Sequence, residues 1–437
     1  MQNSAFSGYK DKSDSAFEHY LQSQWSEYNS FISPSLYKKA KPKVILSATP
    51  KPILTRGPNI HIKVLKKSAK KSAPFLKKRE GIGVKFFGAL LYFSIDAGVK
   101  RARFYPQNKS GIVNAFSVFA SRNENRLLHE IKKSSKSMHL NDWGVYMLVQ
   151  KIAQKSFSDL DDEKLFAWFL LNKLGYDTKV GINAHHIALL SRTKQIIYAA
   201  PKYTIEGKSY YLLSQNALGG TLYTYAKSYP NAIKAVDFSL KSLPLLVQNR
   251  QTKRRTFILQ NREYSISYHY NKNLIDFMKT YPQVSYSVYF STPLQKETLS
   301  DIEASFKPYL DGKKMTYGLN FVLRFVQSAF AYERDQQQFG KEKVMFAQET
   351  LYYDKSDCED RATLYARLVK KLFGISVVGV KYANHMATAL YIPISGASVH
   401  VHGKRYVIAD PTYINANVGE SMPRYKSIIP DKFIYLR

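Results

Sequence analysis

The segment that most limits how this chain can fold is residues 354–374, DKSDCEDRATLYARLVKKLFG. Ser356 or Asp357 can cap a helix, and the acidic residues that follow favour the positive end of its dipole. Apolar side chains then recur at spacings of three and four, which predicts one buried face. Gly374 is a typical residue to end such a helix. We therefore expect a largely buried helix with Cys358 in its first turn.

Cys358 is the only cysteine in the 437 residues, which excludes intramolecular disulfides and a cysteine-based zinc site. A lone cysteine is usually a small buried hydrophobe, and an inert thiol is one interpretation here. The other is a nucleophile, because unpaired N–H groups at a helix N-terminus stabilise a thiolate. Glu359 and Asp360 oppose that stabilisation, so a reactive thiol at this position needs a general base.

Two expected strands downstream could supply the base and an acid to orient it. His385 begins the apolar strand HMATALYI, and Asp410 ends the strand GKRYVIAD just before a proline. Taken singly, His385 could be a satisfied sheet histidine and Asp410 a turn residue. Together with Cys358 they could converge in one groove as base, orienting acid and nucleophile.

The order and context of these residues resemble the transglutaminase-like superfamily, whose triad geometry is similar to that of papain-like proteases. The resemblance covers about residues 318–437: a Cys-x-Asp at the head of a helix ending in Phe-Gly-Ile, a strand His, and a strand ending in Asp-Pro-Thr. It is nearest to uncharacterised bacterial transglutaminase-like proteins, in which a segment like FGKEKVMFAQETLYYDKSDCEDR precedes the helix. It implies Cys358 as nucleophile, His385 as base and Asp410 as orienting acid, on an α+β core with an antiparallel sheet.

The chain also departs from the family pattern. Many members have an aromatic residue shortly after the histidine, where this chain has Met-Ala-Thr, and no tryptophan follows residue 168. A tryptophan oxyanion donor is therefore absent. The Cys358 N–H could serve, with Gln348 or a tyrosine (Tyr352 or Tyr353) as second donor and Asp360 in support. The choice among hydrolysis, crosslinking and no reaction stays open.

The length predicts several domains, and we expect a multidomain α+β protein with β-rich parts upstream of the catalytic core. The expected parts are an N-terminal helix and basic, Pro-rich extended segment (1–80), an α/β domain (81–215), a β-rich module (216–300) and the transglutaminase-like core (301–437).

Within the upstream parts, aromatic spacing predicts a helix over residues 14–31 with Asp14 as its N-cap. Residues 83–95 predict a strand pair or one long buried strand. Short strands are expected at 176–182, 185–190, 195–201 and 209–214.

Residues 163–214 echo the pattern of the core and could be a degenerate copy of it. In that alignment His186 falls near the place of His385, Ser214 or Gln215 near that of Asp410, and Ser158 or Asp159 near that of Cys358. Such a copy has lost its thiol and could only bind or support. The alternative is a chance recurrence of a helix–strand–strand pattern.

The net charge is +32, from 65 basic and 33 acidic residues. This charge favours association with a polyanion such as an anionic cell-envelope polymer, an anionic membrane or nucleic acid, although no recognised nucleic-acid motif supports the last. A general lysine bias is the alternative. Fourteen of the basic residues lie among prolines between Lys38 and Arg79, which predicts an extended linker that could wrap over other domains, or a binding arm.

No apolar run approaches the ~20 residues of a membrane helix, and the first residues contain no signal-peptide pattern. The compartment stays open: periplasmic or secreted if a signal was removed, otherwise cytoplasmic. The pairs His185–His186 and His400–His402 lack a third ligand and are interpreted as loop histidines. We expect no metal and no cofactor.

The leading hypothesis is therefore a thiol-dependent enzyme acting on an amide bond of a peptide or protein through a thioester. It would be a peptidase, an amidase or an acyl transferase. The alternative is a non-catalytic binding or assembly protein of the bacterial cell envelope that keeps the same fold.

Overall fold

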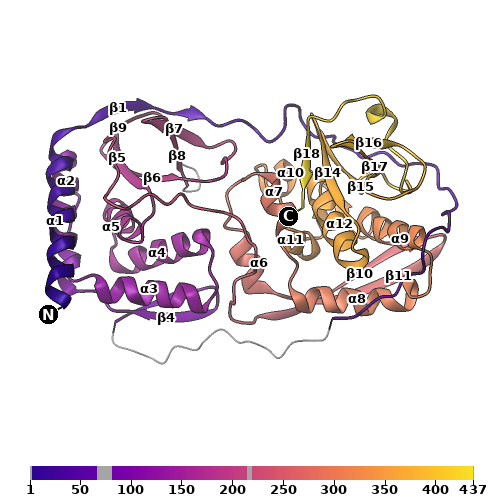
Figure 1. Ribbon diagram of the computed structural model, residues 1–437, viewed down its shortest axis with the longest axis horizontal. Helices are drawn as coiled ribbons and strands as arrows, with labels where there is room; N and C mark the ends of the chain where they lie inside the picture. The colour runs from indigo at the N-terminus through magenta and orange to yellow at the C-terminus, as the bar shows by residue number, and fades with distance from the viewer. Residues whose placement is uncertain (1, 66–80, 214–218, 437) are drawn as a thin grey trace. The chain divides into compact units, whose positions relative to one another are not determined.

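The computed structural model describes residues 2–65, 81–213 and 219–436. About 35% of the protein is helical and 25% is strand, and its larger sheets are antiparallel, so the expected mixed α and β class is confirmed. The chain groups into two compact units (Figure 1). The first contains residues 1–35, 72–238 and 244–247, and the second contains residues 36–71, 239–243 and 248–437.

The first unit combines a bundle of helices with a curved sheet. Its elements are α1 (Gln2–Ser23), β1 (Ser26–Asn29), β2 (Phe31–Ile32), β3 (Ile82–Phe86), β4 (Ala89–Phe93), a 3-10 turn (Ala97–Arg101), α2 (Lys109–Ala120), α3 (Asn125–Ser137), α4 (Asp142–Ser156), α5 (Leu160–Lys173), β5 (Thr178–Asn183), β6 (His186–Arg192), β7 (Pro201–Ile205), β8 (Lys208–Leu212) and β9 (Thr221–Thr224). Residues 83–95 thus form a strand pair. The short strand expected at 195–201 is wrong in its bounds, because the strand in this region begins only at Pro201.

The large sheet of this unit closes almost into a barrel. Its strand order is β1-β9-β5-β6-β8-β7-β2, so β1 and β2 lie at opposite edges. Only Ser30 separates these two strands in the sequence, and the sheet must therefore curve until its edges approach. Ser30 bridges them, since its N–H donates to the Gly220 carbonyl at 3.1 Å and its hydroxyl accepts the Gly220 N–H at 2.7 Å.

The expected helix at 14–31 is wrong in both bounds. The helix ends at Ser23, and the aromatic spacing that suggested a longer helix continues into β1 and β2, where Phe31 is exposed. Asp14 is not an N-cap but a buried mid-helix residue. Its carboxylate bonds the Lys173 ammonium at 2.6 Å and the Tyr229 hydroxyl at 2.7 Å. These partners are more than 150 residues away, so local sequence could not identify them.

The second unit contains a long hairpin, a group of helices and a five-stranded sheet. Its elements are β10 (Arg250–Leu259), β11 (Arg262–Asn271), α6 (Lys272–Met278), α7 (Tyr286–Ser291), α8 (Lys296–Leu310), α9 (Met315–Ser328), β12 (Ala331–Tyr332), α10 (Asp335–Phe339), α11 (Ala347–Tyr352), β13 (Lys355–Ser356), α12 (Cys358–Phe373), β14 (Val377–Tyr382), β15 (His385–Leu390), β16 (Ser398–Val401), β17 (Lys404–Ala409), a 3-10 turn (Pro423–Tyr425) and β18 (Lys432–Tyr435).

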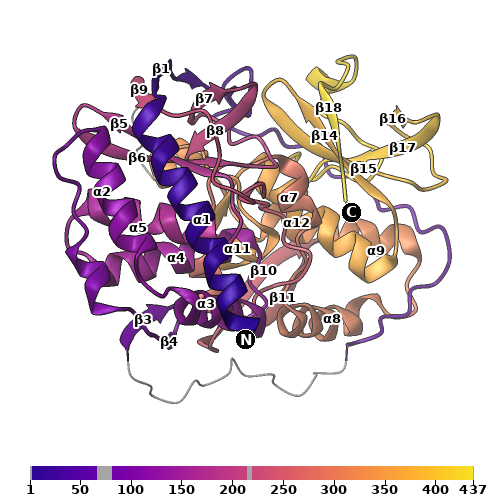
Figure 2. The same cartoon turned by 60° about the vertical axis from the view of Figure 1, so that its left-hand side comes forward.

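Helix α12 is the centre of this unit. It packs against β14 and β15 on one side and against α7, α9 and α11 on the others, and α9 and α12 lie side by side next to the sheet (Figure 2). Residues 36–65 contribute no helix or strand and run in extended form along this unit. Their backbone pairs with it, for example Ile60 with Lys313 and Ala48 with Ile414.

The sheets of the two units share one strand order. The first follows β7-β8-β6-β5-β9 between its edges, and the second follows β16-β17-β15-β14-β18. In each unit a helix ending at a positive-φ glycine, Gly175 in one and Gly374 in the other, precedes the first of these five strands along the chain. The pairs β5–β6 and β14–β15 each form a hairpin with a two-residue turn, closed by the matching pairs Asn183–His186 and Tyr382–His385.

Candidate active site

Cys358 is the first residue of α12, as the sequence predicted. Asp357 caps the helix, and Asp360 completes a capping box by accepting the Asp357 N–H at 3.3 Å. The other oxygen of Asp360 accepts the Met345 N–H at 2.8 Å, which ties the helix start to the loop before α11. Asp360, expected as a supporting residue, thus holds the backbone beside the thiol.

His385 and Asp410 form a buried pair. His385 Nε2 lies 2.9 Å from Asp410 Oδ2, and the side chains are only 1% and 2% exposed. The second carboxylate oxygen of Asp410 accepts the N–H groups of Thr412 and Tyr413. The carboxylate is therefore fixed by its own turn and can fix the imidazole in one orientation.

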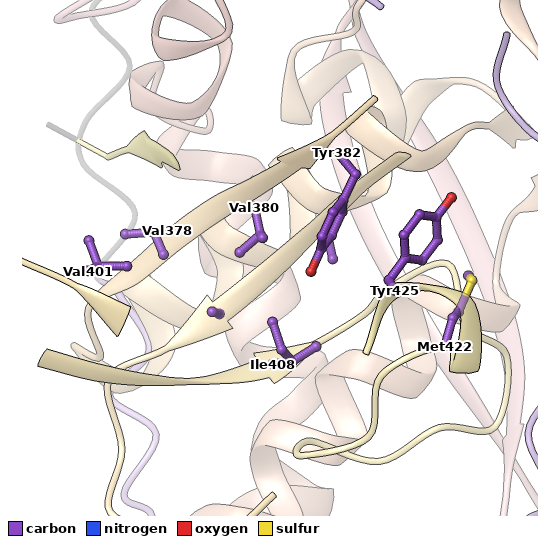
Figure 3. Packing of buried hydrophobic residues seen from close by; sticks show 9 residues of the cluster. Val378, Val380, Tyr382, Val401, Ile408, Met422 and Tyr425 are labelled. Carbon is purple, nitrogen blue, oxygen red and sulfur yellow. The ribbon is translucent and has the colours of Figure 1, made fainter. Parts of the chain in front are cut away.

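Two tyrosines that stack on each other, with centroids 4.7 Å apart, pack against the imidazole. The rings of Tyr425 and Tyr382 stack on His385, with centroids 4.8 and 6.3 Å away, and they belong to an apolar cluster over β14, β15 and β17 (Figure 3). A cavity of about 1050 Å³ opens against the same two tyrosines, with Tyr413 and Ile408 also in its wall. The cavity thus reaches the tyrosines that pack on His385, but neither His385 nor Asp410 lines it.

The thiol of Cys358 is fully buried and bonds to other partners. Its Sγ lies 3.2 Å from Glu359 Oε2 and 3.6 Å from the Tyr37 hydroxyl. Among the residues that the structure describes, no hydrogen bond joins Sγ to His385. Burial, followed by the charges of Glu359 and Asp357, raises the pKa of the Cys358 thiol well above its usual value. In this closed arrangement the sulfur is a protonated thiol.

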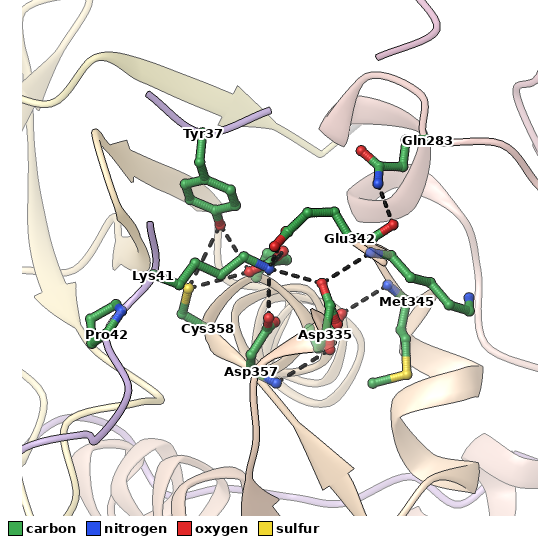
Figure 4. A network of polar contacts seen from close by, with 12 residues as sticks. Tyr37, Lys41, Pro42, Gln283, Asp335, Glu342, Met345, Asp357 and Cys358 are labelled. Atoms are coloured by element: carbon green, nitrogen blue, oxygen red, sulfur yellow. Dashed lines mark hydrogen bonds and ion pairs between the residues drawn. The ribbon is translucent and has the colours of Figure 1, made fainter. Parts of the chain in front are cut away.

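Under the thiol, Lys41 occupies a cage of carboxylates (Figure 4). Its ammonium lies 2.6 Å from Asp357 and Glu359, 2.8 Å from Asp335 and 2.9 Å from Glu342. Burial alone would lower the pKa of Lys41, but the carboxylates raise it well above its usual value. Lys41 therefore stays charged.

The acids of the cage respond in opposite directions. Burial would raise the pKa of Glu359, but the Lys41 charge lowers it to about 2. Burial raises the pKa of Asp335 to about 6 against the opposing pull of the same ammonium. The pKa of Asp357 also rises well above its usual value, through burial and then the Glu359 charge. The cage thus combines one acid that stays ionised, Glu359, with two that bind a proton more easily than usual, Asp335 and Asp357.

The other residues expected at the site have different neighbours. Gln348 accepts the Gln295 N–H at 3.0 Å and donates to the Thr298 hydroxyl at 3.0 Å, both at the start of α8. Tyr353 packs edge-on against Phe339 and Tyr352, with centroids 5.1 and 4.9 Å apart. Within residues 81–213 and 219–436, no hydrogen bond connects either side chain to Cys358.

Sequence reasoning missed Tyr37 and Lys41, because both lie in the segment interpreted as a basic linker. Nothing in the local sequence distinguishes Lys41 from the exposed lysines on either side of it. Among the described residues, every group of three side chains close enough to share a metal ion lies in or beside this cage. None of these groups contains a histidine. His402 instead stacks on Tyr435 and bonds its hydroxyl.

The corresponding positions of the first unit are arranged differently. Asp159 caps α5, and His186 Nδ1 lies 2.9 Å from Asp161 with its side chain 74% exposed. A cavity of about 500 Å³ opens at this helix start, lined in part by Ser158, Asp159 and Asp161. Ser214 and Gln215, the expected counterparts of Asp410, lie outside the described residues.

Comparison with known proteins does not assign the chain to a family: no family model, curated protein or solved structure matches it. Within the described residues, no helix has both the length and the apolar character needed to cross a membrane.

Proposed function

We propose that the second unit is a thiol-dependent enzyme that cleaves or transfers an amide bond of a peptide or protein. The observation that carries the proposal is the buried 2.9 Å bond between His385 Nε2 and Asp410 Oδ2, next to a helix that begins at Cys358. Because Nε2 faces the carboxylate, Nδ1 is the ring nitrogen left to exchange a proton with the thiol.

The chemistry follows from these three groups. His385 takes the thiol proton, and Sγ of Cys358 attacks the carbonyl carbon of the amide. The N–H groups in the first turn of α12 stabilise the oxyanion. The C–N bond then breaks as the imidazolium gives its proton to the departing amine, which leaves a thioester. Water completes hydrolysis, and an amine completes a transfer.

The same proposal extends to the fold. The order of helix, strand His and strand-end Asp supports a transglutaminase-like core in the second unit. The shared strand order and the matching hairpin ends support a duplication, with the first unit as a copy that has Ser158 or Asp159 near the place of Cys358. Its role would be binding or support.

A non-catalytic protein with the same fold is the second candidate. The specific observation in its favour is the electrostatic setting of the thiol, because burial, Glu359 and Asp357 all raise the pKa of Cys358. A protein that only binds or assembles partners needs no reactive thiol.

The rate of Cys358 alkylation by iodoacetamide at pH 7 separates the two candidates. If His385 is the base, His385→Ala lowers the labelling rate at least tenfold, because the thiolate has lost its proton acceptor. His186→Ala is the matched control, since it removes the equivalent histidine of the first unit, and it should label like the unmodified protein. Equal rates for His385→Ala and the unmodified protein would support the non-catalytic candidate.

A further inference from the structure

The proposed catalytic groups are closed off from solvent in this structure. Cys358, His385 and Asp410 are 0%, 1% and 2% exposed. An enzyme acting on a polypeptide has to admit its substrate, so some part of the second unit must cover the site and be able to leave it. The segment that contacts the thiol from outside the core is residues 36–42, which we call the strap.

Tyr37 of the strap covers the sulfur directly. Its hydroxyl donates to Glu359 Oε2 at 2.8 Å and lies 3.6 Å from Cys358 Sγ. Its ring receives the ammonium of Lys381, 4.0 Å from the ring centroid, and meets Tyr286 edge-on. The aromatic side chain thus fills the space through which a carbonyl would reach the thiol.

The strap backbone is bound as an extended ligand would be. The Lys39 N–H donates to the carbonyl of Ala383, in the turn that immediately precedes His385, at 3.1 Å. The Pro42 carbonyl accepts the Tyr332 hydroxyl at 2.8 Å. The strap itself contains no helix or strand. Main-chain bonds combined with pockets for individual side chains, here those of Tyr37 and Lys41, are a usual way to bind a peptide.

Lys41 anchors the strap in the carboxylate cage defined above (Asp335, Glu342, Asp357 and Glu359). An ammonium offers three donors, whereas the cage offers more acceptors than that. Asp335 and Asp357, both at most 1% exposed, each keep one buried oxygen without a hydrogen-bond partner. The cage is therefore built for a cationic group, and the strap supplies one from the chain itself.

We propose that the strap occupies the substrate groove as an intramolecular pseudo-substrate, and that this groove recognises an extended polypeptide with a lysine in the carboxylate cage. The inference rests on the proposed function, since it places the cage beside the reacting thiol. A substrate of this class competes with the strap, and the enzyme stays closed until the strap is displaced.

Strap variants test the occlusion by the rate of iodoacetamide labelling at pH 7. Tyr37→Ala and Lys41→Met should each label at least tenfold faster than the unmodified protein, because one removes the cover and the other removes the anchor. Lys43→Met is the matched control, because it removes a charge directly after the strap but from an exposed side chain, and it should leave the rate unchanged. If Lys41→Met does not fold, Tyr37→Ala decides the question, since that change leaves the buried charges paired. Unchanged rates in the folded variants would overturn the inference.

Competition with a peptide tests the groove itself. A peptide of residues 36–43, LYKKAKPK, should slow labelling of whichever strap variant labels faster, Tyr37→Ala or Lys41→Met, at least fivefold at millimolar concentration. The same peptide with methionine in place of the lysine at position 41 should not. No protection by either peptide would overturn the pseudo-substrate role, and equal protection by both would overturn the lysine pocket.

The same labelling assay separates failure of the strap from failure of the triad. If Tyr37→Ala accelerates labelling but adding His385→Ala to it changes nothing, the strap is supported and the proposed triad is not. If His385→Ala slows labelling in the unmodified protein while Tyr37→Ala has no effect, the triad is supported and the strap is overturned.

Discussion

At the scale of single residues, the charge balance beneath Cys358 depends on one lysine. Asp335, Asp357 and Glu359 are buried within hydrogen-bond distance of Lys41, and Asp360 lies behind them. One positive charge cannot offset four full negative charges in a medium of low dielectric constant. Burial, followed by the charges of neighbouring carboxylates, raises the pKa values of Asp335, Asp357 and Asp360, so that these acids take up protons more easily.

This balance predicts how stability depends on pH. The pKa of Asp335 rises from 3.8 to about 6 on folding, so the folded state binds more protons than the unfolded state between these values. The contribution of Asp335 to stability therefore grows as the pH falls from 7 to 5, by about 1 kcal/mol. Urea unfolding should show that the unfolding free energy of the unmodified protein rises in this way between pH 7 and 5. In Asp335→Asn this rise should be lost. Parallel pH profiles for the two proteins would refute the assignment.

At the scale of elements, α9 controls the loop that carries the acid of the triad. Gln327 is 1% exposed, and its amide donates to three carbonyls of one loop, those of Asp410, Tyr413 and Ala416. Arg324, one turn earlier, bonds Asn415 of the same loop at 2.7 Å. The loop has no regular structure of its own, so the helix fixes where the Asp410 carboxylate meets His385.

Replacement of this amide should affect both stability and the site. Gln327→Leu leaves three buried carbonyls without their donor, and we expect a loss of about 2 to 4 kcal/mol of unfolding free energy. The rate of Cys358 labelling at pH 7 should fall as well, because Asp410 no longer orients the imidazole. Gln337→Leu, at an exposed position of α10, is the control. A Gln327→Leu protein as stable as the control would show that water replaces the amide.

At the level of the complete chain, the two units contain different residues whose signals report unfolding. All three tryptophans, Trp25, Trp143 and Trp168, belong to the first unit, and the single cysteine belongs to the second. Tryptophan fluorescence therefore follows unfolding of the first unit, while exposure of the Cys358 thiol in denaturant follows the second.

These probes predict separate responses to a change in the second unit. Lys41→Met leaves buried carboxylates without a counter-charge, which costs about 3 to 5 kcal/mol when the group is well buried. The urea midpoint for thiol exposure should fall, while the midpoint for tryptophan fluorescence stays the same, because substitutions in one core leave a separate core unaffected. Equal shifts of both midpoints would mean that the two units unfold as one.

The mixed class of the fold and several local elements could be predicted because their signals are local. The α12 segment contains its cap, its buried stripe and its terminal Gly374 within about twenty residues. The prediction at 14–31 failed for the opposite reason. There the aromatic spacing suits both a helix and the edge strands that follow it, and residues 26–32 pair with β9 and β7, which lie more than 160 residues away.

Local sequence was enough to predict that Cys358 starts a helix, that His385 begins a strand and that Asp410 comes directly after another. Helix caps, apolar periodicity and turn residues involve only neighbouring positions in the sequence, so they can be recognised before the fold is known. The bond between Asp410 and His385, the contact of Tyr37 with the thiol and the contact of Lys41 with Glu359 arise from the folded chain alone. The strap is more than 300 residues from Cys358 along the chain, and its lysine resembles its exposed neighbours until buried carboxylates distinguish it.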